Sequence, residues 1–93
     1  MSLVQDMADA LAEDVLKIQD ELGEDRFYME VAKELAASST TLEEAFLTSI
    51  RVRLSERRAR AFINNHIDAA AKALRAGEAV PQARSVGSDN ENL

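Results

Sequence analysis

Five arginines lie within ten residues near the middle of the chain: Arg51, Arg53, Arg57, Arg58 and Arg60. Guanidinium groups bind phosphates and carboxylates, so such a cluster can hold nucleic acid or an acidic protein. The charge around the cluster is divided, because residues 1–48 carry a net −9 and residues 49–76 a net +5 within a chain of −6. The basic block therefore faces either the chain's own acidic half or an acidic partner.

Other side chains with catalytic or metal-binding chemistry do not combine into a site. Carboxylates one helical turn apart occur at Asp9 and Glu13 and at Glu30 and Glu34, but di-iron bundles also need Glu-x-x-His pairs, which this sequence lacks. His66 is the one histidine, and no motif supplies it with a nucleophile. The chain has no cysteine and hence no thiolate. We therefore expect no metal, no cofactor and no enzymatic activity.

The composition is typical of helices. Alanine occurs sixteen times, whereas glycine occurs three times and proline once, too few turn residues for a β-rich domain. The apolar spacing predicts an all-α, bundle-like domain over residues 1–76 with three main helices near 3–22, 25–37 and 41–76. Residues 77–93 are polar and without apolar periodicity, which predicts a disordered tail.

Spacing and capping residues place the predicted helices. In the first helix, one apolar stripe is expected to face the core and consists of Val4, Ala8, Leu11, Val15, Ile18 and Leu22. Gly23 follows where a left-handed C-cap would lie, and Gly77 closes the third helix. Thr41 with Glu44 forms the pattern of a capping box at the start of that helix.

The stretch of residues 49–55 has two interpretations. Ile50, Val52 and Leu54 alternate with arginines, which is the period of a half-buried strand. As a strand followed by a helix capped by Ser55, the stretch resembles the ribbon of ribbon-helix-helix DNA-binding proteins, which implies a dimer whose paired strands enter the major groove. No glycine or proline stops the preceding helix, however, so the favoured interpretation is a continuous helix, or one that breaks near Ser55 into a third and a fourth.

A continuous third helix predicts self-association. At 1.5 Å per residue it would be about 50 Å long, more than helices of about 20 and 13 residues can cover, so part of it would need another subunit. Leu47 and Val52 lie outside its main apolar stripe and would be exposed in a monomer. We therefore expect a homodimer.

The function that the sequence favours is a small non-enzymatic interaction or regulatory module that works by protein–protein contact. The expected contact surface is basic and apolar and consists of Leu47, Arg51, Val52, Arg53, Arg57, Arg58 and Arg60. An acidic protein is a candidate partner, and a ribbon-helix-helix-like dimeric nucleic-acid-binding regulator is the alternative. The sequence has no apolar run of the roughly 20 residues that a membrane span needs. An acidic chain without cysteine suits the cytoplasm.

Overall fold

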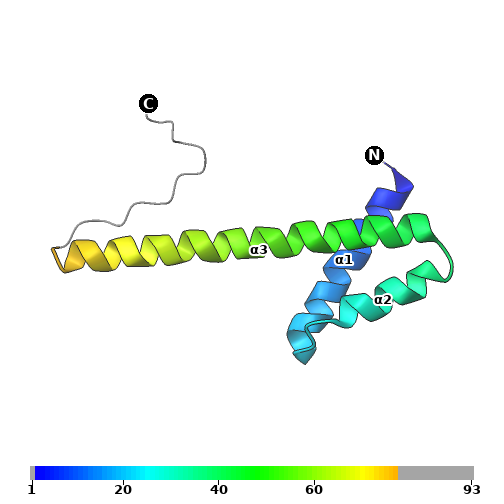
Figure 1. Ribbon diagram of the computed structural model, residues 1–93, viewed down its shortest axis with the longest axis horizontal. Coiled ribbons are helices and arrows are strands. Elements are labelled where there is room, and N and C mark those ends of the chain that lie inside the picture. Colours follow the sequence, from blue (N-terminus) through cyan, green and yellow to red (C-terminus); the bar gives the residue numbers. More distant parts are fainter. Residues whose placement is uncertain (1, 78–93) are drawn as a thin grey trace. The chain divides into compact units, whose positions relative to one another are not determined.

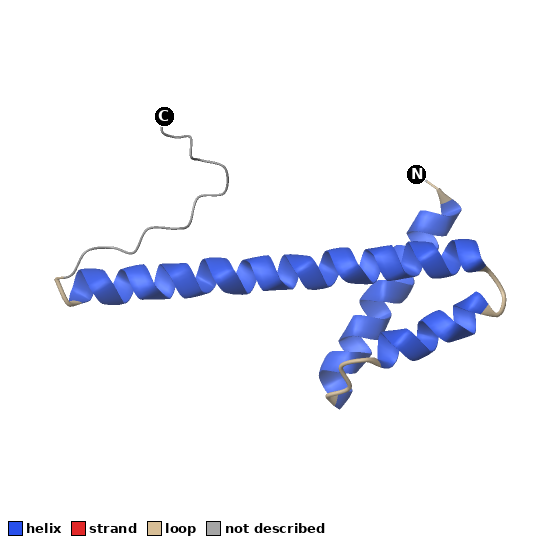
Figure 2. Ribbon diagram, in the orientation of Figure 1, coloured by secondary structure: helices blue, strands red, loops and turns tan. Residues whose placement is uncertain are grey.

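The computed structural model of the protein describes residues 2–77, and these contain three helices and no strand (Figures 1 and 2). The helices are α1 (Leu3–Leu22), α2 (Phe27–Ala36) and α3 (Thr40–Arg75). The predicted all-α fold is therefore confirmed, and each predicted helix end lies within two residues of the observed one. The predicted tail lies outside the described residues except for Gly77.

α3 is one uninterrupted helix through Ser55, so there is no fourth helix in the described chain. Residues 49–55 are helical, and the strand interpretation of that stretch is wrong. The helix continues because Phe46 and Ile50 are buried one turn apart, and their burial favours a period of 3.6 residues over the alternation of a strand. The ribbon-helix-helix-like alternative thus lacks the element on which it depends.

The chain consists of two compact units, and α3 contributes to both. The first unit ends at Glu56 and contains α1, α2 and the first part of α3, and the second begins at Arg57. Within the first unit the chain reverses direction after α1, so that α2 contacts α1 (Figure 1). Each unit is described separately below.

Local hydrogen bonds explain where α1 and α3 begin and end. Ser2 caps α1, since its Oγ accepts from the backbone N–H of Gln5 at 3.0 Å. Gly23 ends α1 in the left-handed region at φ 69°, as predicted. Gly77 has φ 75° just beyond α3.

The predicted capping box of Thr41 and Glu44 is wrong. The cap of α3 is Ser39, whose Oγ accepts from the backbone N–H of Leu42 at 3.1 Å, two residues before the expected Thr41. Both residues belong to a Ser-Ser-Thr-Thr run, in which every side chain is a competent cap. The position is then selected by tertiary packing, which spacing alone does not reveal.

α2 receives its N-terminal hydrogen-bond acceptor from another helix. Its own N-cap residue, Arg26, makes no side-chain capping bond. Instead, Oε1 of Gln19 in α1 accepts from the backbone N–H of Tyr28 at 2.7 Å. Gln19 is buried, and this bond satisfies a polar atom that would otherwise be costly to bury.

The core of the first unit joins all three helices. Its largest fully buried side chains are Phe46 and Ile50 of α3, and they pack with buried residues of α1 and with Ala32 of α2. The buried face of α1 is rotated from the predicted stripe and consists of Ala8, Ala12, Val15, Leu16 and Gln19. Ile18 and Leu22, which were expected in the core, are exposed.

Candidate functional surfaces

A polar cluster joins α1 to α3 within the first unit. The hydroxyl of Ser49 donates to Oδ1 of Asp9 at 2.8 Å and accepts from Nε of Arg53 at 3.1 Å. The guanidinium of Arg53 also lies 3.9 Å from Asp9 and 3.4 Å from Oε2 of Glu13. A basic residue of the central block therefore pairs with the acidic first helix, one of the two possibilities raised by the divided charge.

The hydrogen bonds at Asp9 favour its ionised form. The bond from Ser49 is the main cause that lowers the pKa of the Asp9 carboxyl below its ordinary value, and a second bond, from the side chain of Gln5, adds to it. Partial burial opposes this shift, and the charge of Arg53 reinforces it. A carboxylate held ionised in this way is a poor proton donor, so the cluster is suited to fastening two helices together.

A shallow hollow lies beside this cluster. It is lined by Gln5, Asp9, Thr48, Ser49, Val52 and Arg53 and has a volume of about 180 Å³. Pockets for small molecules are usually about 300–1,000 Å³ and largely apolar. The hollow is smaller than that range, and it does not support a small-molecule site.

The residues predicted to form the contact surface fall into different environments. Leu47 is half-buried and packs against the core, so the expectation that it would be exposed is wrong. Val52 is 63% exposed, as expected. Arg53 is tied to α1, whereas Arg51 is exposed on α3. The three remaining arginines are exposed in the second unit: Arg57, Arg58 and Arg60.

The second unit carries an apolar stripe that the described structure leaves uncovered. Phe62 is 62% exposed, Ile63 47%, Ile67 57% and Leu74 67%. Ile63, Ile67 and Leu74 follow one another at intervals of four and seven residues, which places them on one side of the helix. We call these three residues the α3 stripe, because Phe62 lies about 100–140° around the helix from them. Monomeric proteins rarely leave such a set of large apolar side chains together in water.

None of the four exposed residues belongs to the contact surface that was predicted from the sequence. The available signal was the mismatch between the length of that helix and the helices available to cover it.

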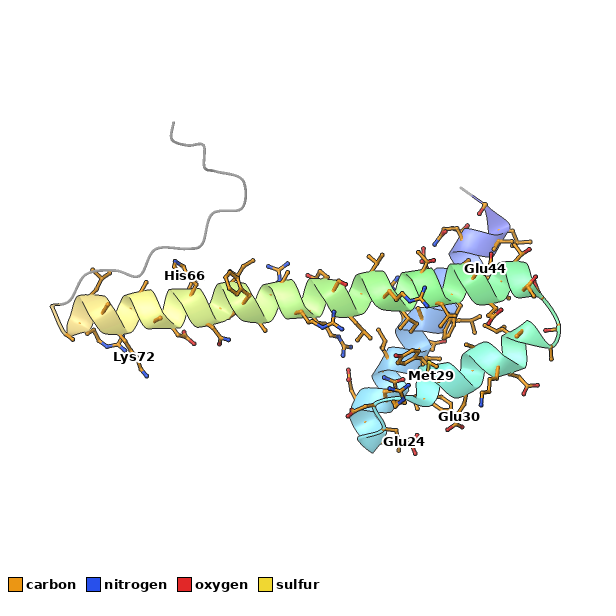
Figure 3. The ribbon with its side chains drawn as sticks, viewed as in Figure 1. Glu24, Met29, Glu30, Glu44, His66 and Lys72 are labelled. Atoms are coloured by element: carbon orange, nitrogen blue, oxygen red, sulfur yellow. The ribbon has the colours of Figure 1, made fainter. Side chains whose placement is uncertain are left out.

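The surroundings of the α3 stripe are basic. Residues 57–77 contain five basic residues and one acidic residue, a net charge of +4. At 3.6 residues per turn, Arg60 lies on the same side as Ile63 and Ile67, while Lys72 lies on the opposite side. Figure 3 likewise shows His66 and Lys72 projecting from different sides of the helix.

Comparisons with known proteins do not identify the chain, since no family model, curated protein or solved structure matches it. Within the helices that the structure describes, none is long and apolar enough to cross a membrane. Among residues 2–77, no three acidic or histidine side chains gather in a way that could hold a metal ion.

Proposed function

We propose that the protein is a small, non-enzymatic interaction module that works as a homodimer, and that the α3 stripe is its contact surface. The observation that carries this proposal is the exposure of four large apolar side chains on one helix. In the first unit, by contrast, the large side chains of Phe46 and Ile50 are fully buried. Covering the α3 stripe would stabilise an assembly by about 25 cal/mol for each Å² of apolar surface removed from water.

The proposed role is regulatory or adaptor-like and cytoplasmic. The lack of cysteine and the acidic composition support a reducing compartment. The basic residues around the stripe favour a partner surface that combines apolar side chains with carboxylates. This narrows the basic part of the surface expected from the sequence. Arg60 lies on the side of Ile63 and Ile67, whereas Arg58 lies on the far side of the helix and Arg51 outside the second unit.

Sedimentation equilibrium tests this proposal with the full chain. The wild type is expected to show a concentration-dependent monomer–dimer equilibrium, and Ile67→Asp is expected to be monomeric because it buries a charge at the contact. The matched control is Arg51→Asp, also at an exposed position of α3 but outside the second unit. A wild type that stays monomeric up to several hundred micromolar, or an Ile67→Asp variant that dimerises normally, would contradict the proposal.

A further inference from the structure

We infer that the α3 stripe of one copy docks on α1 of a second copy, and that the two copies exchange this contact reciprocally. This inference rests on the proposed function and identifies the surface that the α3 stripe recognises. It follows from a second uncovered apolar stripe in the first unit, from the opposite charges around the two stripes, and from their lengths.

The second stripe lies on the side of α1 that does not enter the core. Four large apolar side chains are exposed there: Leu3, Met7, Ile18 and Leu22. Leu11, between Met7 and Ile18, is half-buried and packs against the core, so it is not counted with them. We call the four exposed residues the α1 stripe. α1 is therefore apolar on two sides, and its core-facing side accounts for only one of them.

The charges around the two stripes are opposite. α1 contains six acidic residues and one basic residue, a net charge of −5, whereas residues 57–77 have a net charge of +4. Asp14 and Glu21 are exposed on the same side of α1 as Leu3 and Met7. Arg60 and Arg75 are exposed in the second unit near the α3 stripe. The two stripes are therefore complementary in charge as well as in apolar character.

Pairing the α3 stripe with itself is less favourable. In that arrangement the +4 segments of two copies would lie against each other, and like charges in contact oppose association. Pairing the α1 stripe with itself would bring together two segments of −5. The crossed arrangement avoids both repulsions, and it covers exposed apolar side chains of both stripes.

The lengths of the stripes also agree. At 1.5 Å per residue, the α3 stripe from Ile63 to Leu74 extends about 16 Å and the α1 stripe from Leu3 to Leu22 about 28 Å. The shorter stripe can lie entirely on the longer one. A two-fold dimer would contain this contact twice, once from each copy.

Charge reversal tests the crossed contact. The acidic side is changed by Asp14→Lys with Glu21→Lys, and the basic side by Arg60→Glu with Arg75→Glu. Each double variant alone should weaken the dimer, with Kd raised about 10- to 100-fold at low salt. An equimolar mixture of the two variants should restore nearly wild-type affinity, because both crossed contacts then join opposite charges.

Matched controls change the same charge elsewhere. Arg58→Glu with Lys72→Glu alters the far side of the helix, and Glu30→Lys with Glu34→Lys alters exposed positions of α2. Both are expected to leave Kd within about threefold of the wild type, since dissolved salt screens exposed charges that lie away from a contact. Circular dichroism of every variant verifies that its helix content is unchanged.

The outcomes separate this inference from the proposed function. Loss of affinity in both stripe variants with recovery in the mixture supports the crossed contact. If Ile67→Asp abolishes the dimer while Asp14→Lys with Glu21→Lys does not, the inference is overturned and the proposed function stands. A dimer tightened by Arg60→Glu with Arg75→Glu would show self-pairing of the α3 stripe and also overturn it. A monomeric wild type would overturn both, and would favour a different acidic protein as the partner.

Discussion

Replacing Gln19 by methionine is expected to weaken the start of α2 without leaving a cavity. Methionine is similar to glutamine in length and volume, but it lacks the Oε1 atom that accepts from the backbone N–H of Tyr28 at 2.7 Å. Loss of a helix-capping acceptor costs about 0.5–2 kcal/mol, and an unpaired buried donor costs about 1–3 kcal/mol. Because Arg26 makes no side-chain capping bond, the free energy of unfolding should fall by about 1–2 kcal/mol.

Thermal unfolding followed by circular dichroism measures this loss. A change of 1 kcal/mol lowers Tm by about 4–8 °C in a domain of this size, so Gln19→Met should melt about 4–16 °C below the wild type. All samples must have the same low protein concentration, since association raises Tm. Hydrogen exchange should accelerate at the first amides of α2.

The control for this prediction is Lys17→Met, which introduces methionine at an exposed position of the same helix. It is expected to change the free energy of unfolding by less than about 0.5 kcal/mol. If Gln19→Met and Lys17→Met melt at the same temperature, the bond between Gln19 and Tyr28 contributes nothing measurable, and the explanation given for the burial of Gln19 is wrong.

Three further predictions concern the first unit. Because the pKa of Asp9 is lowered, its ionised form stabilises the fold above about pH 4, and this contribution is lost as the pH falls through the lowered pKa. Ser49→Ala should raise that pKa in an NMR titration, and an unchanged titration would contradict the hydrogen-bond explanation. Ile50→Val should lower the free energy of urea unfolding by about 0.5–1.5 kcal/mol, whereas the exposed Val52→Ala should cost less than about 0.5 kcal/mol; equal losses would contradict the burial difference. Gly23→Ala should cost about 1–2 kcal/mol through its φ of 69° alone, since no atom lies within 4 Å of the added Cβ, and an unchanged Tm would refute this.

The sequence was sufficient to predict the number and bounds of the helices because local signals determine both. Gly23 and Gly77 can end their helices whatever the surrounding contacts, since both adopt a positive φ that other residues avoid. The 3.6-residue spacing of the apolar residues is likewise a property of the sequence itself. These signals do not depend on contacts between distant parts of the chain.

The rotation of α1 could not be predicted in the same way. Its apolar residues extend over more than one side, so spacing alone supports a core face through Ile18 and Leu22 as well as the observed face through Ala12 and Gln19. The choice depends on packing against Phe46 and Ile50, and on the bond that Gln19 makes to α2. Both depend on residues that are far away in the sequence.

The candidate surfaces were predictable only in part. The basic character of residues 51–60 was visible in the sequence, but the contact of Ser49 and Arg53 with Asp9 joins positions 40 or more residues apart. The α3 stripe was not part of the predicted surface, although the length of the third helix predicted that part of it would be uncovered. Periodicity shows which residues share a side of a helix, whereas exposure depends on whether another helix is present to cover that side.

The position of Phe46 and Ile50 also has a consequence for synthesis of the protein. These two residues are the largest fully buried side chains, and both belong to α3. A nascent chain that ends before them lacks the two side chains that pack with residues of both α1 and α2. The core of the first unit can therefore be completed only after Ile50 has left the exit tunnel, and until then a chaperone has access to apolar side chains of α1.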